Sequence, residues 1–160
     1  STEYSDDVIG VEVCAAIKNI YSMLLGASEG LSSKSLDSET KKKYFLNTAA
    51  SLAYKAVAEM KSLTRKLNGK EESVYGLAGL GDLYVSSAGG RNSKMGYYLG
   101  QGHLFREAKE KFMKDITVEG ADLAYEIGPK VLKDFEEKEF PLLFSVIKCI
   151  CNNQKLEINW

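Results

Sequence analysis

The sequence predicts an all-α fold in a single domain, residues 1–160. Two long segments carry apolar residues at helical spacing, one from the Ser5-Asp6-Asp7 cluster to Gly26 and one from about Glu39 to Leu67. No pair of segments shows the sustained alternation of paired strands, although we expect Ile116–Val118 to be locally extended. No linker, repeat or low-complexity tract divides the chain.

The first predicted helix is apolar on more than one face. Its side chains at helical spacing form two sets: Ile9, Val13, Ala16, Ile20 and Leu24, and Cys14, Ile17, Tyr21 and Leu25. So wide an apolar surface is typical of a helix that other elements cover on several sides. The aspartates before it offer N-cap side chains, and a Gly/Ser-rich link is expected to follow from Gly26 to Ser38.

The second helix is expected over Glu39–Leu67, where Gly69 is placed to end it. The lysines Lys41-Lys42-Lys43 near its start predict a solvated helix face. A basic run of this kind gives no reason to expect a nucleic-acid site.

The middle of the chain is rich in glycine. Eight of the fourteen glycines lie between Gly76 and Gly102. Because glycine weakens helices and permits tight turns and close backbone approach, we expect only short helical pieces there, at Leu77–Val85 and Asn92–Leu99. Three further helices are predicted at Leu104–Met113, at Glu119–Glu136 with a bend or interruption at Gly128-Pro129, and at Pro141–Asn152.

Net charge and hydropathy exclude several classes of protein. A formal charge of −1 gives no general attraction to nucleic acid or to an anionic membrane. Glu12, Lys18 and Asn19 interrupt the longest apolar stretch, so we expect no membrane span. No signal-peptide pattern is present either.

The three cysteines, Cys14, Cys149 and Cys151, are an odd number and lie in apolar-rich segments. They predict core thiols in a reducing, cytoplasmic setting rather than a disulfide scaffold. His103 is the only histidine, so no metal site is expected.

Lys18 is the first candidate for chemistry, because an ammonium group in an apolar helix is costly unless another group uses it. In one interpretation burial lowers its pKa, and the amine takes and gives protons near neutral pH. In the other, Lys18 lies on the one wet stripe of the helix and extends to solvent.

The segment GLAGLGDLYVSSAGGRN, residues 76–92, is the second candidate. Asp82 is the one carboxylate between Ser73 and Phe105, and the glycines before Arg91-Asn92 leave free N–H groups at a helix start beside a guanidinium. Such an arrangement suits a phosphate or carboxylate. The plainer interpretation is a turn with a surface charge. The glycine order does not match the dinucleotide fingerprint, and no βαβ pattern surrounds it.

Three blocks in this order, DDVIGVEVCAAIKNI, GLAGLGDLYVSSAGGRN and VEG, closely resemble the C-terminal domain of NAD(P)-dependent glycerol-3-phosphate dehydrogenase. The resemblance implies a helical substrate-binding domain of the type found in 6-phosphogluconate and glycerol-3-phosphate dehydrogenases. It also implies a partner Rossmann domain on the N-terminal side that holds NAD or NADP and that this chain lacks. The implied reaction interconverts sn-glycerol 3-phosphate and dihydroxyacetone phosphate, and a homodimer is possible.

The resemblance assigns roles to individual residues. Lys18 matches the family's catalytic lysine and also contacts the substrate. The other substrate-binding matches are Asn19, Asp82, Ser86, Arg91 and Asn92, of which Ser86 is the weaker. Arg91, Thr117 and Glu119 match positions that contact the dinucleotide. Gly90 stands where many bacterial members have serine, so no hydroxyl contact to phosphate is expected at that position.

Without a Rossmann domain, the chain is expected to lack turnover. An alternative is a non-catalytic module that binds phosphorylated polyols or mediates dimerisation. A third is the helical substrate domain of another 2- or 3-hydroxyacid dehydrogenase, which does not suit an Arg91-Asn92 pair nine residues after Asp82.

Overall fold

The structure, a computed structural model, describes residues 4–33 and 38–158, and of these the side chains of 38–44 lie outside the description. Within the described residues, seven α-helices and two short helical turns follow one another: α1 (Val8–Ser32), α2 (Ser38–Lys66), η1 (Glu71–Tyr75), η2 (Leu77–Gly81), α3 (Asp82–Ser87), α4 (Arg91–Gly100), α5 (Phe105–Phe112), α6 (Glu119–Asp134) and α7 (Pro141–Cys151). No strand occurs in the described ranges, Ile116–Val118 included. The predicted all-α class is confirmed. The side chains of Lys41-Lys42-Lys43 are among those outside the description.

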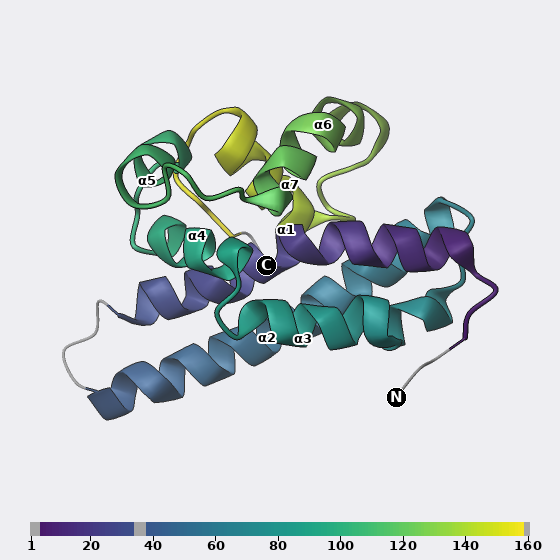
Figure 1. Cartoon of the computed structure of the whole chain (residues 1–160), viewed down its shortest axis with the longest axis horizontal. Helices are drawn as coiled ribbons and strands as arrows, with labels where there is room; N and C mark the ends of the chain where they lie inside the picture. Colours follow the sequence, from purple (N-terminus) through teal and green to yellow (C-terminus); the bar gives the residue numbers. More distant parts are fainter. Residues whose placement is uncertain (1–3, 34–37, 159–160) are drawn as a thin grey trace.

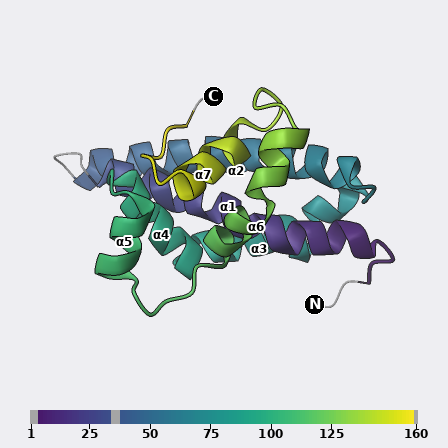
Figure 2. The same cartoon turned by 90° about the horizontal axis from the view of Figure 1, so that it is seen from above.

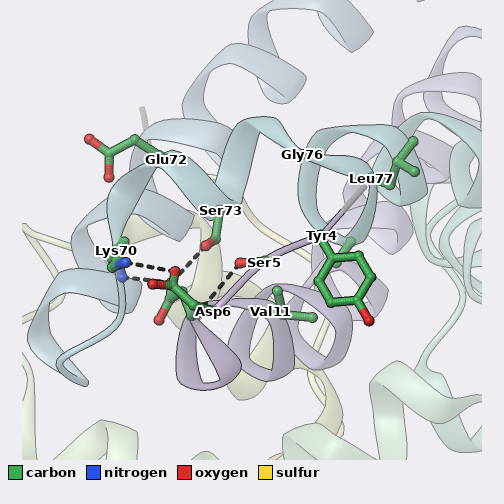
Figure 3. Close-up of a pocket in the computed structure, with 11 residues that line it drawn as sticks. Tyr4, Ser5, Asp6, Val11, Lys70, Glu72, Ser73, Gly76 and Leu77 are labelled. Atoms are coloured by element: carbon green, nitrogen blue, oxygen red, sulfur yellow. Dashed lines mark hydrogen bonds and ion pairs between the residues drawn. The ribbon is translucent and has the colours of Figure 1, made fainter. Parts of the chain in front are cut away.

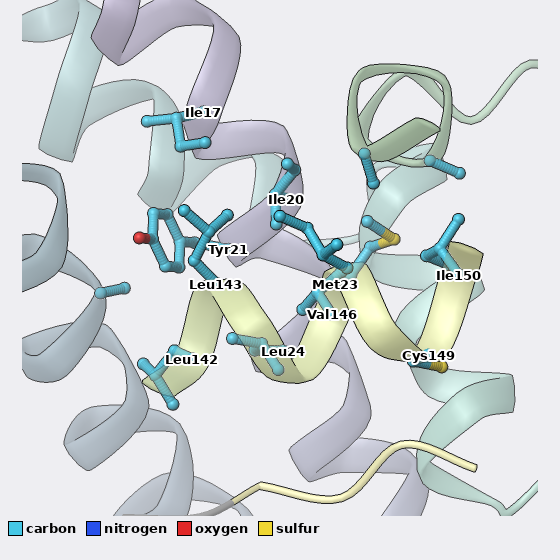
Figure 4. Close-up of a cluster of buried hydrophobic side chains, with 14 of the residues drawn as sticks. Ile17, Ile20, Tyr21, Met23, Leu24, Leu142, Leu143, Val146, Cys149 and Ile150 are labelled. Carbon is cyan, nitrogen blue, oxygen red and sulfur yellow. The ribbon is translucent and has the colours of Figure 1, made fainter. Parts of the chain in front are cut away.

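Helix α1 runs through the centre of the molecule, and α2 returns beside it (Figures 1 and 2). Helices α3, α4, α6 and α7 also contact α1. The wide apolar surface of α1 predicted this central place. Figure 4 shows side chains of α1 packed against those of α7, among them Ile17, Tyr21, Met23, Leu142 and Val146.

The start of α1 is fixed by Asp7, whose carboxylate caps the helix by accepting from the Gly10 N–H at 3.0 Å. The same carboxylate accepts from the Lys70 N–H at 2.8 Å and from the Ser73 hydroxyl at 2.6 Å. The bond from Ser73, above all, lowers the pKa of Asp7. Figure 3 shows the shallow pocket at this end of α1 and the ion pair between Lys70 and Asp6. The N-cap predicted from the aspartate cluster is confirmed.

Helix α1 does not end near Gly26, as the sequence predicted, but continues to Ser32. A β-carbon on Gly26 would lie 2.0 Å from the Ser93 carbonyl oxygen of α4, and one on Gly30 would lie 1.9 Å from that of Tyr97. These glycines therefore allow close packing of helices and do not break α1. The expected Gly/Ser-rich link over 26–38 is wrong for residues 26–32.

The glycines of α4 mirror this arrangement. A β-carbon on Gly96 would lie 1.8 Å from the Met23 carbonyl oxygen, and one on Gly100 would lie 2.0 Å from that of Ala27. The two helices thus meet backbone to backbone, which only residues without a side chain permit. Through this contact α1 sets the position of α4.

Helix α6 continues without interruption through Gly128-Pro129, so the predicted alternative of a break is wrong. Pro129 lies on the exposed side. Gly128 faces α7, where a β-carbon would lie 3.0 Å from the Cys151 sulfur.

An 18-residue stretch of α1 has a mean hydropathy of 1.6, so by length and composition this helix is apolar enough to cross a membrane, contrary to the expectation from the sequence. Half of this stretch is buried inside the fold, as in the core helix of a globular domain. Its apolar character therefore has an explanation in packing against the other helices.

All three cysteines are free thiols. Cys14 and Cys149 are fully buried, and Cys151 is partly buried, with its sulfur 3.3 Å from the Ala124 carbonyl oxygen. The predicted core thiols are confirmed for Cys14 and Cys149.

Candidate functional site

Lys18 and Asp82 form a close ion pair between α1 and the start of α3. The Lys18 ammonium donates to Asp82 Oδ2, and the exposed fractions of the two side chains are 16% and 46%. The amine is therefore held on a carboxylate and does not extend freely into solvent. The interpretation in which Lys18 extends to solvent does not describe this geometry, and proton transfer by its amine stays a prediction.

Asp82 is brought to Lys18 by a compact turn. The turn η2 ends at Gly81, directly before Asp82. Gly79 packs on the preceding segment, where a β-carbon would lie 2.2 Å from the Val74 carbonyl oxygen. The close backbone approach predicted for the glycine-rich segment is confirmed at this point.

Asn92 joins three helices beside this ion pair. Its amide nitrogen donates to the Asn19 side-chain oxygen at 3.1 Å, and its oxygen accepts from the Gly120 N–H at 2.8 Å. Asn19 follows Lys18 on α1, Asn92 is in the first turn of α4, and Gly120 is in the first turn of α6. Because Asn92 is only 5% exposed, these bonds fix its side chain.

Arg91 and Glu119 form a second ion pair next to Asn92. The guanidinium Nη2 of Arg91 donates to Glu119 Oε1, and Glu119 Oε2 lies 3.5 Å from the Asn92 amide nitrogen. The exposed fractions of the Arg91 and Glu119 side chains are 59% and 38%. This end of the site therefore faces solvent, whereas the Asn92 end is buried.

The loop before α4 leaves the first turn of that helix uncapped. Gly89 has φ +121°, a conformation that favours glycine, and Gly90 is the N-cap residue and has no side chain to bond the first turn. The Gly90 N–H donates to the Ser86 carbonyl oxygen at 3.2 Å, and the Ser93 hydroxyl donates to that of Ser87 at 3.0 Å. An uncapped helix start beside a guanidinium suits an anion.

The structure brings most of the predicted site residues together. Two groups form. The first is the pair of Lys18 and Asp82, and the second contains Asn19, Asn92, Arg91 and Glu119. The two groups are linked because Lys18 and Asn19 are adjacent on α1. Ser86 stands apart, because its hydroxyl has no hydrogen-bond partner among the described residues. Thr117 is exposed on the segment before α6, and no hydrogen bond of its side chain to the others is found in the described ranges.

Gly120 is a site residue to which the sequence argument gave no role. A β-carbon there would lie 2.5 Å from the Asn19 carbonyl oxygen, so the glycine lets the start of α6 rest on α1. Its N–H also holds Asn92. The VEG block contained this glycine, but nothing in the sequence alone says which segment it would approach.

Comparison with known proteins identifies relatives along nearly the whole chain. The family model described as NAD-dependent glycerol-3-phosphate dehydrogenase C-terminus matches residues 7–159. The glycerol-3-phosphate dehydrogenase [NAD(P)+] 2 of Lactobacillus delbrueckii subsp. bulgaricus is 35% identical over 147 residues, which are 89% of this chain and 38% of that protein. The NADP(+)-dependent glycerol-3-phosphate dehydrogenase of Archaeoglobus fulgidus is 32% identical over 160 residues, which cover 97% of this chain and 44% of that protein.

A solved structure gives the same result in three dimensions. The crystal structure of glycerol-3-phosphate dehydrogenase from Coxiella burnetii superimposes with a TM-score of 0.75 at 31% identity, over 94% of this chain and 42% of that one. The chain thus spans about two fifths of the length of the relatives it matches. On the match to residues 7–159, the chain belongs to the family of the C-terminal domain of NAD-dependent glycerol-3-phosphate dehydrogenase.

Proposed function

We propose that this chain, residues 1–160, is the substrate-binding and catalytic half of a glycerol-3-phosphate dehydrogenase. Such an enzyme interconverts sn-glycerol 3-phosphate and dihydroxyacetone phosphate by hydride transfer with NAD or NADP. The observation that carries the proposal is the pairing of the Lys18 amine with Asp82 beside the Asn19, Asn92 and Arg91 cluster. Lys18 and Asn19 are adjacent on α1, and this supports a site that combines proton transfer with anion binding.

Lys18 is the general base and acid. In oxidation its neutral amine takes the proton of the hydroxyl on the middle carbon, and in reduction the ammonium returns a proton to the ketone oxygen. Asp82 holds the amine in place through the ion pair, and Asn19 orients the substrate oxygen by hydrogen bonding. Proton transfer by one positioned side chain supplies about 10²–10⁴-fold in rate.

The phosphate is bound at the start of α4. Arg91 offers a planar guanidinium, which suits the oxygens of a phosphate, and the uncapped first turn of the helix adds N–H donors. Asn92 orients this end of the site through its bonds to Asn19 and Gly120. Ser86 lies near the end of α3 and is the weaker contact.

The dinucleotide is held mainly by a separate Rossmann domain. The described residues contain no strand and therefore no βαβ phosphate loop. Arg91, Thr117 and Glu119 fit a contact from the substrate side, because all three are at least partly exposed. When bound, the nicotinamide supplies the hydride acceptor or donor. We further propose a cytoplasmic location, which free thiols support, and dimerisation, which rests on the resemblance alone.

The proposal is tested by supplying the chain with a Rossmann domain from one of its relatives. NADH oxidation with dihydroxyacetone phosphate is then followed. Lys18→Ala is expected to lower the rate by about 10²–10⁴-fold, because the proton-transfer group is lost. Lys133→Ala, at an exposed position of α6, is the matched control and is expected to keep the activity. Activity that survives Lys18→Ala would contradict the role of the amine.

A non-catalytic module is distinguished by calorimetry on the chain alone. Tight binding of glycerol 3-phosphate without any dinucleotide would favour a sensor of phosphorylated polyols. Weak binding, together with no NADH oxidation by the chain alone, is expected of half an active site.

A further inference from the structure

The carboxylate of Glu119 contacts the same side chains to which an incoming anion would bind. Its Oε1 accepts from the Arg91 guanidinium, and its Oε2 lies 3.5 Å from the Asn92 amide nitrogen. Arg91 and Asn92 are the adjacent residues to which the phosphate of the substrate is assigned above. One carboxylate from α6 thus bridges both.

The position of Glu119 is fixed by the main chain around it. Glu119 is the first residue of α6, where the N-terminal end of the helix favours a negative charge. The next residue, Gly120, rests on α1 and donates its N–H to Asn92. The Glu119 side chain is still 38% exposed and Arg91 is 59% exposed, so both side chains have room to separate.

A phosphate and this carboxylate compete for the same group. Both anions bind a guanidinium through paired oxygens, so a phosphate on that edge of Arg91 displaces Glu119. A dianion next to an ionised carboxylate is also repelled at short range. The carboxylate therefore opposes phosphate binding in two ways, by holding the arginine and by its charge.

We propose that Glu119 is an intramolecular competitor that holds Arg91 while the site is empty and so sets the affinity for the substrate phosphate. This inference rests on the proposed function only for the position of the phosphate. Glu119 is an affinity-determining residue that acts through Arg91.

The test is a titration of the 160-residue chain with inorganic phosphate and with glycerol 3-phosphate, followed by ¹⁵N NMR including the arginine side-chain N–H signals. Glu119→Gln removes the charge and keeps the size and the hydrogen-bonding end of the side chain. It is expected to bind phosphate about two- to fivefold more tightly, since the competing exposed ion pair is lost. Glu126→Gln makes the same change at an exposed position of α6 and is expected to leave the affinity unchanged.

Two further variants separate this inference from the proposed function. In Arg91→Ala/Glu119→Gln the gain in affinity is expected to disappear, because the contested group is missing. If folded Glu119→Gln binds phosphate no more tightly than the unchanged chain, or if neither binds it, the inference is overturned. Where the unchanged chain does bind phosphate and Arg91→Ala alone weakens that binding, the proposed phosphate position stands. Unchanged binding by Arg91→Ala would overturn both.

Discussion

The buried carboxylate of Glu59 joins three helices at one point. On α2 and only 5% exposed, it accepts from the Tyr21 hydroxyl of α1 at 3.0 Å. It also accepts from the Leu142 and Leu143 N–H groups at the start of α7, at 2.8 and 3.0 Å. Burial raises the pKa of Glu59. The carboxylate thus supplies the cap that α7 lacks from its own N-cap residue.

Glu59→Gln is expected to destabilise the fold although its size is unchanged. All three partners of Glu59 are donors, and an amide places a further donor among them. The free energy of unfolding, measured by urea denaturation, is expected to fall by about 1–3 kcal/mol. Glu126→Gln, at an exposed position, serves as the control. Equal stability of the two variants would contradict the capping role.

The thiol of Cys149 is expected to be chemically inert in the native protein. Burial raises its pKa to about 12, so very little thiolate exists at neutral pH. At pH 8, alkylation by iodoacetamide should be about 10³-fold slower than in the chain unfolded in urea, where the ordinary cysteine pKa returns. Mass spectrometry of quenched samples measures both rates, and native labelling as fast as unfolded labelling would rule out this burial.

The grouping of candidate residues was predictable where several groups of known chemistry occur in a recognisable order. Lys18, Asp82, Arg91 and Asn92 were singled out from the sequence, and the structure brings them into two adjoining groups. Glu59 was not, because a single glutamate in an amphipathic helix resembles a solvated position. Its partners lie 38 to 84 residues away, and no local pattern indicates them.

At the scale of elements, the crossing of α1 and α4 is the contact that positions the site. Gly26 and Gly30 on α1 meet α4, and Gly96 and Gly100 on α4 meet α1. Arg91 and Asn92 begin α4, so the separation of these two helices sets their distance from Lys18 and Asn19. The glycines therefore determine the spacing of the candidate site residues although none of them is itself a candidate site residue.

Gly96→Ala is expected to destabilise the fold. The new β-carbon would lie 1.8 Å from the Met23 carbonyl oxygen, so the two backbones must separate. Overpacking of this kind costs about 1–3 kcal/mol or more, which thermal and urea denaturation would measure.

Gly81→Ala is the matched control for this variant. There a β-carbon would find its nearest neighbour, a Leu77 methyl carbon, at 3.5 Å, an ordinary contact. We expect little loss of stability, because alanine also favours helix more than glycine does. Equal stability of Gly96→Ala and Gly81→Ala would show that the crossing tolerates a side chain.

Element boundaries were harder to predict than element types because glycine and proline can either end a helix or lie within one. The glycines at 26 and 30 were interpreted as a link, and only the partner helix shows that they allow contact. Pro129 was expected to bend or interrupt α6, and the interruption is wrong, since the helix carries the proline on its exposed side. For the glycines, the deciding interaction comes from a segment distant in sequence.

At the scale of the whole molecule, the fold class followed from periodicity, whereas the central role of one helix followed from its lack of a polar face. Helix α1 was predicted to be buried on several sides, and α2, α3, α4, α6 and α7 surround it. The same composition also passes a length and hydropathy test for a membrane span. Hydropathy alone does not distinguish a membrane span from a core helix, whereas the packing of other helices against α1 does.

The ion pair of Lys18 with Asp82 has a mechanical consequence. Lys18 lies in the middle of α1, and neighbouring residues of that helix form the core. The packing fixes the backbone of Lys18, so only its flexible four-carbon side chain can change the position of the amine. In the enzyme proposed above, any movement that closes the site therefore carries the backbone of Lys18 together with the helices that pack on α1.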